Sequence, residues 1–224
     1  MILRHELKHE INYADYLLLK KRLKDMLRPD PHAGAHGEYR VRSLYFDDPF
    51  DRALTEKIGG VNKREKFRIR CYNANFDFIR LEKKTKRSGL SRKQSARLCS
   101  AEVENILQGE YDFLLSRDEE LLQELYVKIK SNLLRPRTIV EYIREPFLYT
   151  AGNVRITLDR DIRTGMRSLD FFTVDPLLVP VDEAFAVLEV KFDQFIPDFI
   201  VQLVQLGSRR SAAFSKYAHS RKYD

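Results

Sequence analysis

The sequence of 224 residues lacks the features that define several large protein classes. It has only two cysteines, Cys71 and Cys99, and they do not form a metal-type pair, so neither a disulfide scaffold nor a cysteine-based metal site is expected. No apolar run approaches the roughly 18 residues that a membrane-spanning helix needs. The N-terminal stretch MILRHELKHEI also lacks the apolar core of a secretory signal. These absences predict a soluble, cytoplasmic protein.

The chain also lacks internal repeats, low-complexity tracts and any linker long enough to separate two domains. Its hydrophobic content of 43% is sufficient for a packed core, although 33% of the residues are charged. We therefore expect a single domain over residues 1–224.

Charge of one sign is in excess. Lys and Arg number 40 against 33 Asp and Glu, and the isoelectric point is about 9.3. This balance favours a polyanionic partner, such as nucleic acid, an anionic membrane or a phosphorylated small molecule, but does not choose among them.

The segment KFRIRCY, residues 66–72, has cations at every second position and apolar residues between them. As a strand, it directs three cations to one face and three apolar side chains to the other. Five further segments alternate in a similar way. Their polar faces comprise Arg4, Glu6 and Lys8; Arg80, Glu82, Lys84 and Lys86; Tyr142 and Arg144; Arg155, Thr157, Asp159 and Asp161; and Glu189 and Lys191.

One charged face is ordinarily solvated surface. Six such faces, in which Arg and Lys together outnumber Glu and Asp, are costly because like charges on neighbouring strands destabilise a sheet. A sheet that closes on itself solves the problem if its interior binds anions. The seven or eight expected strands are linked by turns or single helices, as in antiparallel barrels. We therefore predict an α+β fold with a closed, eight-stranded antiparallel β-barrel and helices packed outside it.

The mixed charges of these faces suggest a division of chemical roles. Arg and Lys hold phosphate oxygens, Arg in bidentate fashion and Lys as a point charge. Glu and Asp would instead bind Mg²⁺ or Mn²⁺, which bridges to the phosphates. Such a site predicts metal-dependent transfer of a phosphoryl group.

Several short motifs in a fixed order resemble those of the triphosphate tunnel metalloenzymes, and most closely the polyphosphate polymerase domain of the vacuolar transporter chaperone (VTC) type. They are RHELKHEI, RSLYFDD, KFRIRCY, LEKKTK, YIREPF, RITLDRDI, LEVKF and FSKY, and together they cover nearly the whole chain. No single motif is specific; the ordered set is. The resemblance implies an eight-stranded barrel whose bore is a basic tunnel.

The resemblance also implies roles for individual residues. The predicted catalytic, phosphate-binding residues are Lys8, Arg68, Arg70, Lys84, Arg144, Arg155, Lys191 and Lys216. The predicted further substrate-binding residues are Arg4, Lys66, Lys86, Lys93 and Tyr142, and the predicted ligands of Mn²⁺ or Mg²⁺ are Glu189, Glu6 and Glu82. One departure is that Arg4 replaces the first glutamate of the superfamily's Glu-x-Glu-x-Lys signature. It favours the polymerase branch, where this strand is more basic.

These assignments predict ATP-dependent synthesis of polyphosphate with release of ADP, and ATP, polyphosphate or pyrophosphate as ligands. The alternatives are a tripolyphosphatase or nucleoside triphosphatase that uses water, and a non-catalytic polyanion binder. Nucleic acid is not expected, because aromatic residues do not recur on the basic faces. The resemblance also suggests a membrane-protein partner, which would place the protein at the inner face of a membrane.

Some residues also have purely structural interpretations. Lys66 could be surface at the strand's start, Lys86 could be solvated, and Asp159 and Asp161 fit either metal ligands or a turn cap. The Leu-rich helix expected over 119–134 is core packing. For the basic C-terminal segment, we expect an ordered helix that caps one end of the tunnel and carries Lys216, rather than a solvated tail.

Overall fold

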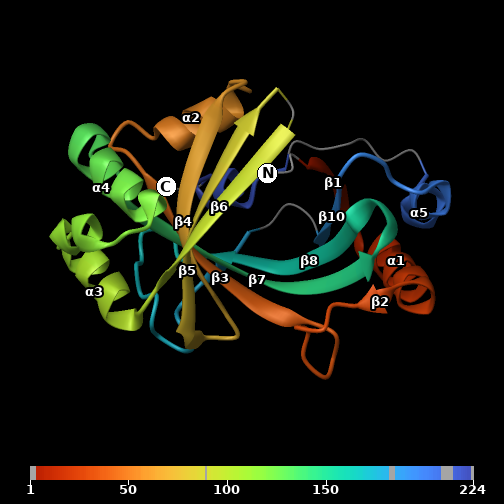
Figure 1. Ribbon diagram of the computed structural model, residues 1–224. Helices are drawn as coiled ribbons and strands as arrows, with labels where there is room; N and C mark the ends of the chain where they lie inside the picture. The colour runs from red at the N-terminus through yellow and green to blue at the C-terminus, as the bar shows by residue number, and fades with distance from the viewer. Residues whose placement is uncertain (1–3, 89, 182–184, 208–213, 223–224) are drawn as a thin grey trace.

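The computed structural model describes residues 4–88, 90–181, 185–207 and 214–222, and its main feature is one strongly curled antiparallel sheet (Figure 1). In chain order, its strands are β1 (His5–Ile11), β2 (Arg28–Pro29), β3 (Tyr39–Asp47), β4 (Arg64–Tyr72), β5 (Asn75–Arg87), β6 (Leu90–Leu98), β7 (Arg135–Tyr149), β8 (Val154–Thr164), β9 (Val179–Pro180) and β10 (Ala186–Phe192). The strand order is β1-β10-β8-β7-β3-β4-β5-β6, with β2 beside β7 and β9 beside β8.

The sheet curls without closing completely. Its edge strands, β1 and β6, meet at one isolated bridge, in which the backbone N–H of Arg4 lies 3.5 Å from the carbonyl oxygen of Ser91. The prediction of a fully closed barrel is therefore wrong, and the fold is an α+β half-barrel. Both edges carry cations, Lys8 on β1 and Arg92 and Lys93 on β6. Like charges on facing strands disfavour a longer ladder.

Most helices cover the outside of the curled sheet in two groups (Figure 1), whereas the last one supplies Lys216 and Tyr217 to the inner side. The helices are α1 (Tyr13–Met26), α2 (Arg52–Ile58), α3 (Ser100–Gln108), α4 (Glu120–Asn132), α5 (Asp198–Val204) and α6 (Lys216–Ser220), with short 3₁₀ turns at Asp112–Ser116 and Ala151–Asn153. One apolar core lies between α3, α4 and strands β4 to β6, and another between α1, α5, β8 and β10. Within the described ranges, no helix combines the length and apolar character needed to cross a membrane.

As predicted, the alternating sequence of β4 places its apolar side chains on one face of the sheet and its cations on the other. Phe67, Ile69 and Cys71 are buried in the core beneath α3 and α4. The intervening cations point to the inner side of the curl, where they line a cavity. The apolar face is therefore covered by helices, and the charged face is enclosed by the sheet.

Three local predictions need correction. The helix expected over 119–134 ends at Asn132, and Leu133 after it has a left-handed conformation with φ of 55° and is 61% exposed. The polar segment Leu90–Leu98 lacks the apolar alternation that predicts a strand, yet it pairs with β5 along its whole length. The helical C-terminal region consists of two short helices, α5 and α6, and residues 208–213 between them lie outside the described residues.

Candidate active site

The inner side of the curled sheet encloses a cavity of about 560 Å³. All sixteen residues predicted to be catalytic, substrate-binding or metal-binding line this cavity. Arg4 directly precedes β1, and the others come from β1, β4, β5, β6, β7, β8, β10 and α6, which are distant in sequence. The curl of the sheet therefore brings every predicted site residue to one place. We call this space the basic cavity.

The lining of the basic cavity is strongly positive. It contains fifteen Lys and Arg side chains and three carboxylates, Glu6, Glu82 and Glu189. The whole chain has a surplus of only seven positive charges, so the remainder of the molecule is net negative. Such concentration of one sign within low-dielectric walls attracts anions of high charge density.

Strands β4, β5 and β6 form what we call the arginine wall, made of Arg68, Arg70, Glu82 and Lys93. Glu82 is 1% exposed, and its Oε2 accepts hydrogen bonds from Nε and Nη2 of Arg68 at 2.8 and 2.7 Å. Arg70 Nη1 lies 3.6 Å from the same oxygen, and Lys93 contacts the other oxygen. Burial alone would raise the pKa of Glu82, but these cations hold it far below its usual range. The carboxylate is thus permanently charged and fixes the arginines.

Tyrosine and serine hydroxyls orient the two arginines further. Arg68 Nη1 donates to Tyr45 Oη at 3.0 Å, while Arg70 donates to Ser43 Oγ at 3.0 Å and to Tyr142 Oη at 3.2 Å. Burial would raise the pKa of Tyr45, but Arg68 and Arg70 lower it to about 8. The guanidinium groups are therefore preorganised before any ligand binds.

Strands β1 and β10 form what we call the carboxylate wall, made of Glu6, Lys8, Glu189 and Lys191. The register pairs Glu6 with Lys191 and Lys8 with Glu189, so opposite charges face each other. Lys8 Nζ lies 3.2 Å from Glu6 Oε1 and 3.4 Å from Glu189 Oε2. Burial would raise the pKa of Glu6, but Lys8 and other nearby cations lower it to about 2. Both carboxylates are therefore ionised at neutral pH.

Asp159 on β8 is a buried counter-ion and does not line the cavity. Arg144 makes a bidentate pair with it at 2.7 Å for both bonds, and Lys216 Nζ donates to it at 2.6 Å. Asp161 instead is exposed, has φ of 50° and pairs with Arg163 on the surface. Because α6 supplies Lys216, the C-terminal segment lines the cavity.

The remaining predicted residues have weaker or more exposed contacts. Arg155 donates to Asp30 Oδ2 at 2.9 Å and to Tyr39 Oη at 2.7 Å. Lys66 Nζ lies 3.4 Å from Ser215 Oγ and 4.8 Å from the centre of the Tyr217 ring. The other recorded contacts are Lys84 with Glu6 and Arg4 with Asp193.

The three glutamates predicted to bind metal belong to two different walls of the cavity. Glu6 and Glu189 share Lys8 on adjacent strands, whereas Glu82 is engaged by the arginine wall. Among the residues that the structure describes, no three His, Cys, Asp or Glu side chains gather as a metal-binding group. Mg²⁺-type ions commonly use one or two carboxylates and take further oxygens from phosphates. Glu6 and Glu189 fit such a site, and metal binding by all three glutamates stays a prediction.

The sequence reasoning did not select several residues of the cavity. Tyr39 and Tyr45 lie on the inner face of β3, together with Ser43, and the period-two pattern of residues 39–45 would have placed them there. Ser215 and Tyr217 flank Lys216 on α6, where no strand pattern applied. The additional cations are Lys57, Arg64 and Arg92.

Comparisons with known proteins agree with this architecture. The chain matches the VTC domain over residues 3–223. The Hippeastrum protein HpAC1, described as an adenylyl cyclase with a dominant triphosphatase activity, has a TM-score of 0.57 at 12% identity, covering 99% of this chain and 95% of its own. The PH1012 protein from Pyrococcus horikoshii OT3 has a TM-score of 0.51 at 13% identity, covering 95% and 96%.

No curated protein matches the chain in sequence. Identities of 12–13% to solved structures establish a shared fold alone. The family match, in contrast, spans nearly the whole chain and includes every segment that lines the basic cavity. The chain therefore belongs to the VTC domain family, and the predicted resemblance to the VTC type is confirmed.

Proposed function

We propose that this protein transfers the terminal phosphoryl group of ATP to the end of a phosphate chain, making polyphosphate and releasing ADP. The observation that carries this proposal is the convergence of all sixteen predicted residues on one basic cavity, in a chain of the VTC domain family. A cavity with fifteen cations suits a ligand as highly charged as a triphosphate.

The chemistry requires positioning more than proton transfer. A terminal oxygen of the acceptor forms a bond to the γ-phosphorus, and the bond from that phosphorus to the β,γ-bridging oxygen breaks as ADP leaves. The acceptor oxygen is already anionic, so no general base is needed. Arg68, Arg70 and Arg144 would hold phosphate oxygens in line and neutralise the charge that develops.

Mn²⁺ or Mg²⁺, when bound at Glu6 and Glu189, would neutralise phosphate charge as a Lewis acid. Lys8 lies between these carboxylates and would keep their oxygens oriented. Lys191, which contacts Glu189, would add to the attraction for phosphate in its protonated form.

Hydrolysis is the alternative with the same site, with water in place of the phosphate acceptor. Water needs a base to remove its proton. All three carboxylates that line the basic cavity are already engaged by Lys or Arg. In the described lining, no carboxylate is therefore unengaged and ready to act as that base, and the third possibility is polyanion binding without turnover.

The test is incubation of the purified protein with ATP and Mn²⁺, followed by gel analysis of the products. Long phosphate chains support the polymerase, free phosphate alone indicates a hydrolase, and binding without turnover indicates a polyanion binder. Arg68→Ala and Glu189→Ala should each abolish synthesis while circular dichroism shows a folded protein. A folded Arg68→Ala protein with full activity would refute the assignment.

A further inference from the structure

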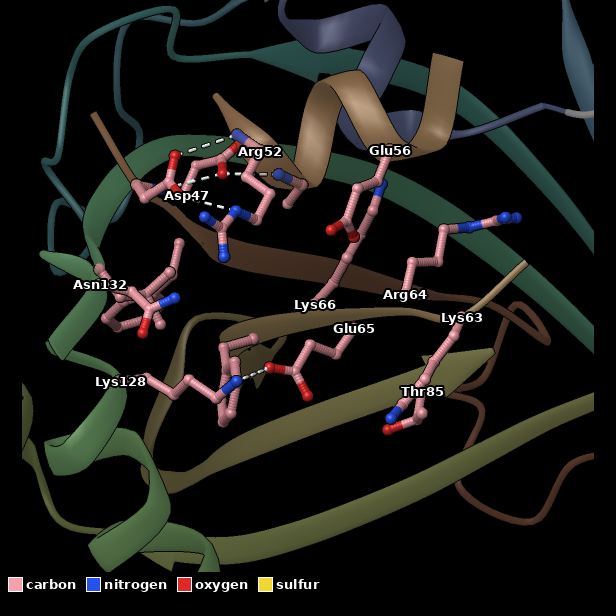
Figure 2. Close-up of a pocket in the computed structure, with 15 residues that line it drawn as sticks. Asp47, Arg52, Glu56, Lys63, Arg64, Glu65, Lys66, Thr85, Lys128 and Asn132 are labelled. Carbon is pink, nitrogen blue, oxygen red and sulfur yellow. Dashed lines mark hydrogen bonds and ion pairs between the residues drawn. The ribbon is translucent and has the colours of Figure 1, made fainter. Parts of the chain in front are cut away.

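A second cavity, of about 280 Å³, adjoins the basic cavity (Figure 2). It lies between α2, the start of β4, β5 and the end of α4. Arg64 and Lys66 line both cavities, so the two spaces meet at these side chains. Phe67, whose side chain points to the outside of the sheet, also lines it. The second cavity is therefore not confined to the inner side of the curl.

The path of β3 explains this opening. Pairing between β3 and β4 ends at Tyr45 and Arg68. A bulge between Tyr45 and Phe46 follows, and β3 continues beside β7 only. Residues 64–67 of β4 consequently have no β3 neighbour, and α2 covers the gap. We call this space, where the wall of the sheet is interrupted, the side window.

The buried carboxylate of Asp47 anchors α2 over the side window. It accepts hydrogen bonds from the backbone N–H groups of Ala53 at 2.8 Å and Leu54 at 3.2 Å. It also accepts hydrogen bonds from the backbone N–H of Asp48 at 2.9 Å and from the hydroxyl of Tyr217 in α6. Figure 2 shows Arg52 and Glu56 of α2 at the upper side of the space and Lys128 at its lower side. The window is thus a supported part of the fold.

The side window differs from the basic cavity in its charge. Its cations are Arg52, Lys63, Arg64, Lys66 and Lys128, and its carboxylates are Asp47, Asp48, Glu56 and Glu65. With five cations and four carboxylates, the side window is close to neutral, whereas the basic cavity has fifteen cations and three carboxylates. Such a balance opposes the passage of a polyphosphate chain. Phe46, Phe67 and Leu134 add apolar surface, and Thr85 and Asn132 add hydrogen-bonding groups.

We propose that the side window binds the nucleoside part of a nucleoside triphosphate whose phosphates lie in the basic cavity. This inference rests on the proposed function, in which ATP is the donor, and adds the place where the nucleoside part of the donor binds. A nucleoside triphosphate combines a neutral ring system with a highly charged tail, and the two cavities have the matching division of charge. The apolar surface and mixed polar groups of the window suit a base and a ribose. Arg64 and Lys66 stand where the two parts of the ligand would join.

The test fills the window while leaving the basic cavity unchanged. Asn132→Trp and Thr85→Trp introduce a bulky ring from α4 and from β5, and neither residue lines the basic cavity. The matched control is Val127→Trp, on the same helix as Asn132, at a side chain that is 56% exposed and does not line either cavity. Calorimetry with Mn²⁺ measures the dissociation constants of ATP and of tripolyphosphate for all four proteins.

We expect the dissociation constant of ATP to rise about tenfold or more in both window variants, a loss of about 1.4 kcal/mol. The constant for tripolyphosphate should change less than about twofold, and Val127→Trp should match the wild type for both ligands. Equal changes for the two ligands, or no change for either, would overturn the assignment of the window. If the wild-type protein binds neither ligand, the proposed function itself fails, which is a separate and recognisable result.

Discussion

The arginine wall and the carboxylate wall line the same cavity, but they differ in how their buried charges are balanced. In the arginine wall, the single carboxylate of Glu82 is contacted by three cations, Arg68, Arg70 and Lys93. In the carboxylate wall, the register alternates Glu and Lys nearly one for one. The first arrangement leaves a local excess of positive charge, whereas the second is close to neutral. The difference suggests that the first wall holds phosphates and the second holds a metal ion.

The arginine wall can still bind a ligand, because its arginines have more N–H donors than their protein partners use. Each guanidinium has five N–H donors in a fixed fork. Arg68 uses donors on Glu82 and Tyr45, and Arg70 on Ser43 and Tyr142, so both keep N–H groups for phosphate oxygens. The internal partners hold the fork in place, and both arginines line the cavity.

The largest expected effect comes from removing the single carboxylate of the arginine wall. In Glu82→Gln, three cations lose their shared counter-ion, and breaking a buried ion pair in this way typically costs about 3–5 kcal/mol. Urea unfolding measures the loss. Tripolyphosphate should restore more stability to Glu82→Gln than to the wild type, because it supplies the missing negative charge. A variant as stable as the wild type without ligand would show that Glu82 does not balance this wall.

A second prediction is that a substitution in the carboxylate wall weakens Mn²⁺ binding, whereas one in the arginine wall does not. Glu189→Gln should weaken Mn²⁺ binding in the presence of tripolyphosphate by about tenfold or more, since even residues that support metal ligands contribute that much. Electron paramagnetic resonance titration of Mn²⁺ measures the affinity. Glu82→Gln is the matched comparison and should keep the wild-type affinity for Mn²⁺. If the two variants lose metal equally, the division between the walls is wrong.

A third prediction concerns a substitution in the arginine wall that removes a planar guanidinium group but keeps the positive charge. Arg68→Lys should raise the dissociation constant of tripolyphosphate about tenfold, because lysine cannot make the two parallel hydrogen bonds of a guanidinium. Calorimetry provides the value. The reciprocal change in the other wall, Lys191→Arg, should have a smaller effect, because that position acts through charge. An equal loss at both positions would argue against a special role of the arginine geometry.

The smallest expected effect is a dependence on pH through Lys66, at the edge of the cavity. Burial, assisted by Lys57 and Arg64, lowers the pKa of Lys66 to about 8. Above that pH, Lys66 loses its proton, and its attraction for phosphate is lost. Tripolyphosphate affinity should therefore decline by a few fold between about pH 7 and 9. Burial also lowers the pKa of Lys84, in the same cavity, to about 8. Lys66→Arg should therefore remove only part of this decline, because arginine stays charged at position 66 while Lys84 still titrates.

The stability of the free protein should respond in the opposite direction. Because the pKa of Lys66 is lower in the folded state than its ordinary value of 10.5, protonation of the folded protein is penalised. The contribution of Lys66 to the free energy of unfolding is complete above about pH 10.5 and is lost as the pH falls through about 8. Unfolding in urea across this range, for the wild type and Lys66→Arg, gives the comparison.

Much of the candidate site was predictable because strand periodicity is local. In β4, β5 and β10, every second side chain points to the same face, so the sequence alone identified the cations and glutamates that share the inner side. The polar strand β6 was harder to predict, because its pattern lacks the apolar alternation that marks a half-buried strand. The ordered motifs supplied the family.

The sequence by itself determined which side chains of a strand share a face, because successive side chains along a strand alternate between its two faces. Only the tertiary structure decided which faces meet. It set the incomplete closure between β1 and β6, the use of Asp159 as a counter-ion, and the side window beside the bulge of β3. These features depend on register and long-range charge pairing between segments far apart in sequence, and no local pattern encodes them.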